Sequence, residues 1–321
     1  MNIYIKTTEK CNLRCKHCYN GIHNGKLDYA RVALFLNKIN NTCNDNYFIF
    51  HGGEPLLGNI TEMQNLVNAF PDNKWRITSN LSFDLSSSMK TLLNSMDEIR
   101  TSFDIGIRFS KLSSLLTWMR NVKDLSKSNK NIVLICCLTK TLIQHSPSQI
   151  LSMAKHLGIK KLMFERISYT GDAEKNNIHS ANYNEIDNWL CEMYKIKDTG
   201  YKIRINEFEN IIAGITNNMG NYRGIECCQS TLTINSDNTI GRCPNNARKF
   251  IVGNLDSSVN NIISQKVCAC YTINNHCLEC DYYERCHGGC ASQTWQDNTC
   301  PYPKKLSDLI YGDLYEHISV I

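Results

Sequence analysis

Residues 2–20 read NIYIKTTEKCNLRCKHCYN, an apolar run that leads directly into a loop with Cys11, Cys15 and Cys18. The apolar run predicts a strand. The cysteines have three and two residues between them, so their thiols can surround one metal cluster. A [4Fe-4S] cluster has four irons, and three cysteine ligands leave one iron open for an exogenous ligand. We therefore expect a metal cluster at the end of the first strand.

Strands and helices alternate along the next 200 residues or so. Apolar runs predict strands at 2–7, 47–51, 74–78, 98–103, 131–139 and 161–166. Segments 28–40 and 112–126 each place four apolar residues on one helical face, which we expect to point to the core. These faces consist of Val32, Phe35, Leu36 and Ile39, and of Leu115, Leu116, Met119 and Val122. Ser146 before Pro147 is typical of a helix start, and Gly158 of a helix end.

This alternation predicts an α/β fold with a parallel sheet, a partial (βα)6 barrel similar to a TIM barrel. Functional side chains are then expected at the carboxyl ends of the strands. After about Gly214 the sequence changes to cysteine, glycine, asparagine and aromatic residues with short extended runs. We expect one domain over residues 1–213 and a small cysteine-rich domain over 214–321, which ends in a helix at 304–319.

Composition limits the class of protein. The chain has 321 residues, 42% of them hydrophobic, and no apolar run approaches the roughly 18 residues of a membrane span. The first ten residues have no apolar segment typical of a secretory signal, so we expect a soluble cytoplasmic protein. The net charge of +5 is spread along the chain and gives little reason to expect a nucleic-acid partner. In that compartment, clusters among 17 cysteines favour metal binding over disulfides.

The sequence resembles the radical S-adenosylmethionine (radical SAM) superfamily, whose hallmark is a CxxxCxxC loop after the first strand. Cys11, Cys15 and Cys18 match that loop, and Tyr19 supplies the aromatic residue after it. The resemblance implies a [4Fe-4S] cluster whose open iron binds the amino and carboxylate groups of SAM. One electron from the cluster then cleaves SAM to a 5'-deoxyadenosyl radical, which abstracts hydrogen from the substrate.

Other segments match further motifs of the superfamily. Gly52-Gly53-Glu54-Pro55 at the end of the second strand resembles its GGEP motif, and the ends of the third and fourth strands resemble its ribose and carboxylate contacts. The segment from Glu165 to Ala173 resembles the region of its adenine and substrate contacts. The resemblance assigns cofactor binding to Tyr19, Gly52, Gly53, Glu54, Asn80, Ser102, Asp104 and Arg108.

Simpler interpretations exist for several of these residues. Gly-Gly-Glu-Pro is a common turn sequence, and Ser102 and Asp104 are typical helix caps. His17 is expected to be an ordinary loop residue. Cysteines in apolar or isolated positions are expected in the core as small apolar residues, and these are Cys43, Cys136, Cys137 and Cys191.

The C-terminal cysteines resemble the SPASM extension of the superfamily, which carries auxiliary iron-sulfur clusters. The resemblance implies one cluster bound by Cys277, Cys280, Cys286 and Cys300, and a second bound by Cys228, Cys243 and Cys290. The fourth ligand of the second cluster is left open between Cys227, Cys268, Cys270 and a vacant position. Runs 232–235 and 239–242 predict a β-hairpin, with Asn238 where the family has glycine. Paired CxxC units also suit structural zinc, which remains an alternative.

Together the resemblances imply a radical SAM/SPASM maturase that modifies a ribosomally made precursor peptide by a crosslink, a thioether or a related change. Alternatives are a sulfatase-maturating or small-molecule radical SAM oxidoreductase, and, in another class, a zinc-stabilised scaffold protein. The chain leaves no room for an N-terminal peptide-recognition domain, so peptide binding is expected to use a separate protein or the catalytic domain itself. The chemistry also implies a reducing partner such as flavodoxin or ferredoxin.

Overall fold

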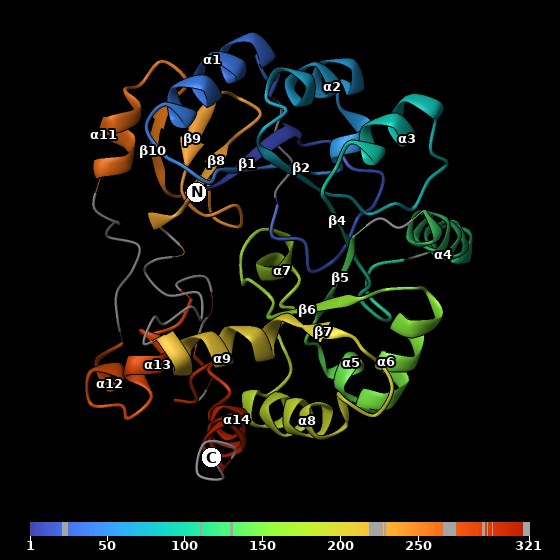
Figure 1. The fold of residues 1–321 in the computed structure, drawn as a ribbon, viewed down its shortest axis with the longest axis vertical. Coiled ribbons are helices and arrows are strands. Elements are labelled where there is room, and N and C mark those ends of the chain that lie inside the picture. The colour runs from blue at the N-terminus through green and yellow to red at the C-terminus, as the bar shows by residue number, and fades with distance from the viewer. Residues whose placement is uncertain are drawn as a thin grey trace.

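A computed structural model describes most of the chain (Figure 1). The described residues are 1–20, 25–109, 111–128, 131–217, 227, 229–265, 274–290, 293, 295–296 and 298–316.

One sheet of ten strands runs through the described part of the molecule in the order β10-β9-β8-β1-β2-β3-β4-β5-β6-β7. From β8 through β1 to β7, neighbouring strands are parallel, whereas β9 is antiparallel to both β8 and β10. The strands are β1 (Asn2–Thr8), β2 (Tyr47–Gly52), β3 (Lys74–Thr78), β4 (Glu98–Ser102), β5 (Ile132–Cys137), β6 (Lys161–Glu165), β7 (Arg204–Ile205), β8 (Thr231–Ile234), β9 (Thr239–Gly241) and β10 (Ile251–Asn254).

Helices connect the parallel strands and most of them form the outer layer, whereas the short α7 lies inside the ring of strands in this view (Figure 1). Those of the first part are α1 (Tyr29–Asn40), η1 (Pro55–Leu57), α2 (Ile60–Ala69), α3 (Ser87–Asn94), α4 (Leu112–Lys127), α5 (Lys140–Ile143), α6 (Pro147–His156), α7 (Asp172–Lys175), α8 (Tyr183–Ile196) and α9 (Asn206–Asn217). Those of the C-terminal part are α11 (Val259–Ser264), α12 (Asn275–Leu278), α13 (Tyr283–Cys286) and α14 (Lys304–Glu316). The predicted α/β fold with a parallel sheet is confirmed.

Alternation along β1 explains which side chains reach the core and which face the other side of the sheet. Ile3 and Ile5 are fully buried in the core cluster shared with the surrounding helices. Tyr4 and Lys6 point to the opposite face, because successive side chains of a strand alternate. Lys6 is nevertheless buried, with 2% of its surface exposed. The inner face of the sheet at β1 therefore carries polar groups, of which Lys6 is buried and Tyr4 half-buried.

Several local predictions hold. Ser146 and Gln149 form a capping box at the start of α6, with Pro147 in the first turn. Gly158 follows the helix with a φ of +73°. Val32, Phe35, Leu36 and Ile39 are the buried face of α1.

The predicted core face of α4 is wrong in part. Leu116 and Met119 are 56% and 37% exposed, although the spacing placed them with Val122 in the core. The helix buries Trp118, Asn121, Val122 and Leu125 instead. The Trp118 indole donates to Thr101 Oγ1 and stacks on Phe103 at 4.9 Å, and this aromatic contact rotates the helix away from the expected face.

The C-terminal part continues the same sheet. The predicted hairpin is confirmed as β8 and β9, and β8 lies parallel to β1. Asn238 in the turn has a φ of +69°, a conformation that asparagine tolerates better than most other residues. The domain division near residue 214 stays a prediction. It falls inside α9, and the strands that follow are hydrogen-bonded to the first part of the chain.

Helix α14 packs on α8 through a carboxylate cap. Asp187 of α8 accepts hydrogen bonds from the backbone N–H groups of Lys305 and Leu306 at 2.9 and 3.0 Å, in the first turn of α14. Gln296 binds the start of α8 and the residues before it. Its Oε1 atom accepts from the N–H of Tyr183, and its Nε2 group donates to the carbonyl oxygens of Ser180 and Ala181. The cysteine-rich part is thus bound to the first part at α8 as well as at β1.

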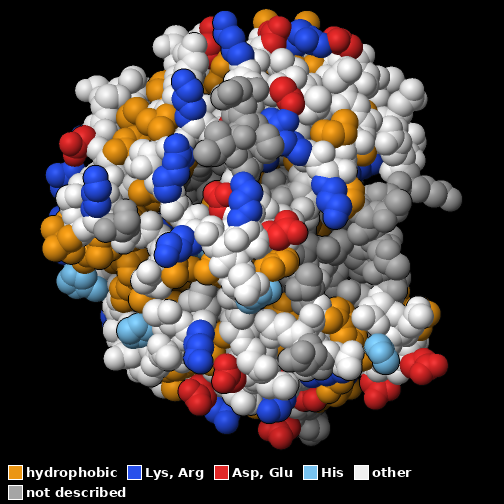
Figure 2. All heavy atoms as spheres, turned by 180° about the vertical axis from the view of Figure 1, so that it is seen from behind, with side chains coloured by type: hydrophobic (Ala, Val, Ile, Leu, Met, Phe, Trp, Pro, Cys, Tyr) orange, Lys and Arg blue, Asp and Glu red, His pale blue; other side chains and the backbone are white. Residues whose placement is uncertain are grey.

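None of the helices in the described ranges combines the length and apolarity that crossing a bilayer requires. On the face shown in Figure 2, lysine and arginine side chains are interspersed with acidic and apolar ones, in agreement with the modest net charge.

The carboxyl ends of β1 and β2 approach so closely that only glycine fits between them. Gly53 N–H donates to Thr8 O and Glu54 N–H donates to Lys10 O, both at 2.8 Å. A Cβ atom on Gly53 would lie 2.4 Å from Lys10 O and 2.5 Å from Glu9 O. Gly52 has a φ of +141°, which side chains other than glycine rarely adopt. This contact fixes the backbone that immediately precedes Cys11.

We predict that Gly53→Ala lowers the free energy of unfolding by about 2–3 kcal/mol, because the added methyl group overlaps backbone oxygens. Gly312→Ala is the matched control, since, outside its own helix backbone and chain neighbours, no atom of the described residues lies within 4 Å of its Cβ position in α14. There alanine should stabilise the helix by about 1 kcal/mol. Urea denaturation of both variants measures the difference, and equal effects of the two substitutions would contradict the steric argument.

Candidate functional site

The CxxxCxxC loop lies at the carboxyl end of β1, where parallel α/β sheets hold their active sites. The loop turns tightly, with Cys18 N–H donating to Cys15 O at 3.1 Å. Cys11 Sγ accepts from Leu13 N at 3.4 Å and from Asn80 Nδ2 at 3.7 Å. All three cysteines are partly buried. The structure thus places the three thiols on one compact loop at the expected edge of the sheet.

The thiols have properties that suit metal binding. Burial raises the pKa of Cys15 to about 11, although Arg108 lowers it, and the Cys18 and Cys11 thiols contribute to the rise. Burial also raises the pKa of Cys11 and of Cys18. Neighbouring thiolates that repel one another are stabilised by a bound cation, which deprotonates thiols on coordination. The donor set therefore fits an iron-sulfur cluster.

Glu54 lies at the centre of the contacts behind the loop and is fully buried. Its carboxylate accepts from Ser79 Oγ and Asn80 N at 2.7 Å, and from Leu56 N at 3.1 Å. Burial raises the pKa of Glu54 to about 7, against these hydrogen bonds, which lower it. The carboxylate joins the end of β2 to the end of β3.

Asn80 carries this connection to the cysteine loop. Its Nδ2 group donates to Asn12 Oδ1 at 2.8 Å and to Cys11 Sγ, while its Oδ1 atom accepts from Ser82 Oγ at 2.6 Å. The expected role of Asn80 as a ribose contact stays a prediction. In the structure the side chain positions the first cysteine and the residue after it.

A second network holds the loop from the side of β4 and β5. Asp104 Oδ2 accepts from His17 Nε2 at 3.0 Å and from Arg108 Nε and Nη2 at 2.7 and 2.6 Å. Its Oδ1 atom accepts from Cys137 N at 2.8 Å. Although burial opposes ionisation, Arg108 and then His17 hold the pKa of Asp104 well below its usual range. The carboxylate is ionised and fully hydrogen-bonded.

This network changes the interpretation of two residues. His17 is buried and bonded to Asp104, so the prediction of an ordinary loop residue is wrong. Cys137 lies beside Asp104 at the end of β5, and ligand atoms of His17, Asp104 and Cys137 fall within 4.8 Å of one another. The Arg108 guanidinium already neutralises Asp104, which disfavours a cation there. Cofactor binding by Asp104 and Arg108 stays a prediction, and in the structure the two side chains form an ion pair.

Tyr19 extends the loop toward the inner face of the sheet. Its hydroxyl lies 3.1 Å from His51 Nε2, and the His51 ring also contacts Tyr4 edge-on at 5.5 Å. Burial lowers the pKa of His51 to about 3, so the imidazole is neutral near pH 7. Ser102 ends β4 at the inner edge and is partly buried.

The segment after β6 closes the loop from the other side. Gly171, with a φ of +63°, packs so closely on the backbone of Tyr19 that a Cβ atom would lie 2.5 Å from its carbonyl oxygen. The N–H groups of Asp172 and Ala173 then donate to Cys18 O at 2.8 and 3.3 Å. The motif expected to hold substrate contacts is thus in direct contact with the cysteine loop.

Four C-terminal cysteines line one cavity of about 530 Å³. They are Cys277, Cys280, Cys286 and Cys300, the set that the resemblance assigns to one auxiliary cluster. Burial raises the pKa of Cys286 to about 12, and the Cys300 and Cys277 thiols contribute to this rise. Tyr183 and Asp187 of α8 share the cavity wall. Four thiols around one space suit either a [4Fe-4S] cluster or zinc.

Of the three cysteines assigned to the second auxiliary cluster, the described residues include Cys243 and Cys290. Cys243 follows the β8–β9 hairpin near Tyr19: burial raises the pKa of Tyr19, and the Cys18 and Cys243 thiols contribute to this rise. Cys290 lies near Tyr183, whose pKa is raised by burial and, to a smaller extent, by Cys290 and Cys300. Cys227 is exposed. Cys228, Cys268 and Cys270 lie outside the described residues, so the ligand set stays a prediction.

Comparisons with known proteins agree with this architecture. Residues 4–108 match a family model described as a 4Fe-4S single cluster domain. The fold is similar to that of anSMEcpe with bound AdoMet, at a TM-score of 0.80 and 17% identity, covering 100% of this chain and 95% of that one. The chain therefore shares the fold of this AdoMet-bound protein over its whole length, the cysteine-rich C-terminal part included.

Two further solved structures share this fold. Native anSMEcpe with bound AdoMet and Cp18Cys peptide has a TM-score of 0.80 at 17% identity, with 100% of this chain and 99% of that chain covered. Streptococcus suis SuiB bound to precursor peptide SuiA has a TM-score of 0.65 at 16% identity, with 90% and 71% covered. No curated protein matches the chain in sequence.

The pKa of Glu54 predicts a pH dependence of stability. Its folded-state pKa of about 7 exceeds that of an unfolded glutamate, about 4.3, so its contribution to stability is lost as the pH rises between these values. In metal-free protein, wild type should lose roughly 3 kcal/mol relative to Glu54→Gln between about pH 4 and pH 8. Urea denaturation across this range measures it. The exposed control Glu192→Gln should follow wild type, and parallel curves for Glu54→Gln would refute the prediction.

Proposed function

We propose that the protein is a radical SAM enzyme that modifies a peptide. The observation that carries this proposal is the thiol trio of Cys11, Cys15 and Cys18, which lies on a closely held loop at the carboxyl edge of a parallel sheet. When bound there, a [4Fe-4S] cluster and SAM supply a radical able to abstract hydrogen from an unactivated position. The match of residues 4–108 to a 4Fe-4S domain supports the same assignment.

The chain's own part in this chemistry is to hold the three thiols and to limit their access to water. Asn80 donates to Cys11 Sγ, Arg108 O lies 3.9 Å from Cys15 Sγ, and Asn20 O lies 3.4 Å from Cys18 Sγ. Each thiol therefore has a different neighbour that orients it. Around them the buried carboxylates of Glu54 and Asp104 fix the adjoining strand ends. We infer that Gly52, Gly53, Ser102 and Tyr19 border the SAM site.

A peptide is the proposed substrate, because two proteins of the same fold were crystallised with peptides, Cp18Cys and SuiA. The modification we propose is a crosslink, a thioether or a related change. Cys277, Cys280, Cys286 and Cys300 are the proposed ligands of one auxiliary [4Fe-4S] cluster, and Cys228, Cys243 and Cys290 of a second. Flavodoxin or ferredoxin is the proposed electron donor, and a separate protein is the proposed aid to peptide recognition.

Replacing Cys11, Cys15 and Cys18 together by alanine should abolish formation of 5'-deoxyadenosine from SAM. Protein reconstituted without oxygen should also lose about four irons per chain, since one cubane cluster is no longer bound. Iron analysis and chromatography of the nucleoside, after reduction with dithionite, measure both quantities. Unchanged SAM cleavage in this variant would sink the proposal, and zinc in place of iron in the wild type would favour the scaffold alternative.

Replacing Cys277, Cys280, Cys286 and Cys300 by alanine should act differently. This variant should lose about four irons but should still cleave SAM, because the N-terminal loop lies at a different place in the fold. The same two assays apply, with a screen of small peptides by mass spectrometry as the test of substrate class. Loss of SAM cleavage together with retention of all iron would contradict the assignment of these cysteines.

A further inference from the structure

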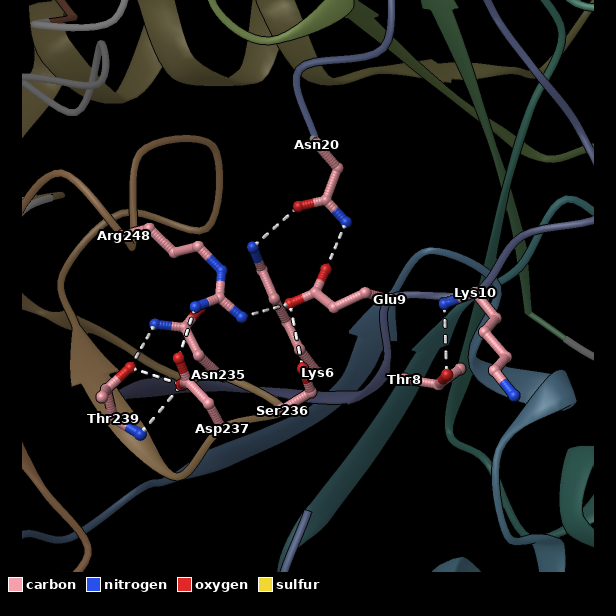
Figure 3. Close-up of polar contacts among 10 residues, drawn as sticks. All are labelled: Lys6, Thr8, Glu9, Lys10, Asn20, Asn235, Ser236, Asp237, Thr239 and Arg248. Carbon is pink, nitrogen blue, oxygen red and sulfur yellow. Dashed lines mark hydrogen bonds and ion pairs between the residues drawn. The ribbon is translucent and has the colours of Figure 1, made fainter. Parts of the chain in front are cut away.

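The ends of the cysteine loop are joined by two side chains. Glu9 precedes Cys11 by two residues, and Asn20 follows Cys18 by two. Asn20 Nδ2 donates to Glu9 Oε2 at 2.8 Å, and Lys6 Nζ of β1 donates to Asn20 Oδ1 at 3.0 Å (Figure 3). The order of atoms is fixed chemically, because an ammonium needs an acceptor and a carboxylate needs a donor.

The same carboxylate binds the C-terminal part of the chain. Glu9 Oε1 accepts from Arg248 Nη2 at 3.0 Å and from Ser236 Oγ at 3.2 Å. Arg248 also pairs with Asp237 in the turn of the β8–β9 hairpin (Figure 3). The Glu9 side chain is only 1% exposed. Its two oxygens therefore connect both ends of the cysteine loop to the hairpin segment without access to bulk water.

We infer that Glu9, Asn20, Ser236 and Arg248 form a clasp that positions the three-cysteine loop and ties it to the loop bearing Cys243. Arg248 follows Cys243 by five residues, and Cys243 acts on the pKa of Lys6, which burial lowers and Glu9 raises. The clasp thus determines how the first cysteine region sits against the second. The positioning of cluster ligands by the clasp rests on the proposed function, whereas the contacts within the clasp do not.

The clasp makes a specific prediction about exchanging donor and acceptor. In Glu9→Gln, the NH2 group of the introduced amide has two orientations, and in both a donor faces a donor. It meets either the NH2 group of Asn20 or the guanidinium of Arg248. Rotating Asn20 instead would turn its NH2 group to the Lys6 ammonium. In Asn20→Asp, two carboxylates face each other. Each single substitution therefore leaves one mismatched buried contact, which destabilises folded protein.

The double variant Glu9→Gln/Asn20→Asp restores every pairing. Its amide NH2 group donates to the introduced carboxylate, which still accepts from Lys6, and its amide oxygen still accepts from Ser236 and Arg248. Arg248 keeps Asp237 as a charged partner. If the two side chains only filled space, the loss of stability in the double variant would equal the sum of the losses in the two single variants.

The first measurement uses metal-free protein under reducing conditions. Each single variant should lower the midpoint of urea denaturation, and the double variant should recover most of the loss. Asp256→Asn, which removes an exposed carboxylate paired with Arg31, is the control and should leave the midpoint unchanged. Single variants that match wild type, or a double variant whose losses simply add, would overturn the clasp. If a single variant does not fold, recovery of folded double variant is the supporting result, and its failure to fold counts against the clasp.

The second measurement follows iron content and 5'-deoxyadenosine formation from SAM after anaerobic reconstitution. We expect Glu9→Gln to slow the reaction by about 10- to 100-fold, with restoration in the double variant, because small displacements of reacting groups reduce rates to this extent. Unaltered rates in Glu9→Gln overturn the positioning role. A wild type that binds no iron would refute the proposed function, whereas the urea experiment would still decide whether the clasp exists.

Discussion

The close approach of β1 and β2 at their carboxyl ends is the constraint on which the site depends. Two glycines let backbone meet backbone, and the hydrogen bonds from Gly53 and Glu54 to Thr8 and Lys10 fix the chain before Cys11. Glu54 then transmits this position to the end of β3, where Asn80 contacts the first thiol. A motif expected to bind a ligand therefore also performs a structural task. Its residues are needed for the loop to exist in this shape.

Buried carboxylates organise the rest of the site. Glu54 is bound by neutral donors and has its pKa raised by burial, whereas Asp104 is bound by Arg108 and His17 and has its pKa lowered. Glu9 forms the third such centre. The oxygens of each carboxylate accept hydrogen bonds from groups on different elements. Because a buried charge without such partners costs roughly several kcal/mol, these contacts hold the elements together. The cysteine loop is fixed at three separate points.

The C-terminal cysteine-rich part contributes β8, β9 and β10 to the same sheet. β8 pairs with β1, and α14 docks on α8 through Asp187, so both cysteine regions share elements with the core of the molecule. This arrangement places Cys243 near Tyr19 and places the cavity of Cys277, Cys280, Cys286 and Cys300 against α8. The two regions are more than 200 residues apart in sequence but belong to one framework.

The sequence by itself determined β1 to β6, the helices α1, α4, α6 and α14, the hairpin and the grouping of cysteines, because spacing and periodicity are local properties. It also predicted the edge of the sheet at which Cys11 would lie. It did not predict the short strands β7 and β10. Only the tertiary structure revealed that His17 pairs with Asp104 and that Glu9 meets Arg248, since these partners are 87 and 239 residues apart. The exposed face of α4 likewise depended on where Trp118 found its aromatic neighbours. Local pattern determines what a segment forms, whereas burial of charge and aromatic packing are settled only when distant segments meet.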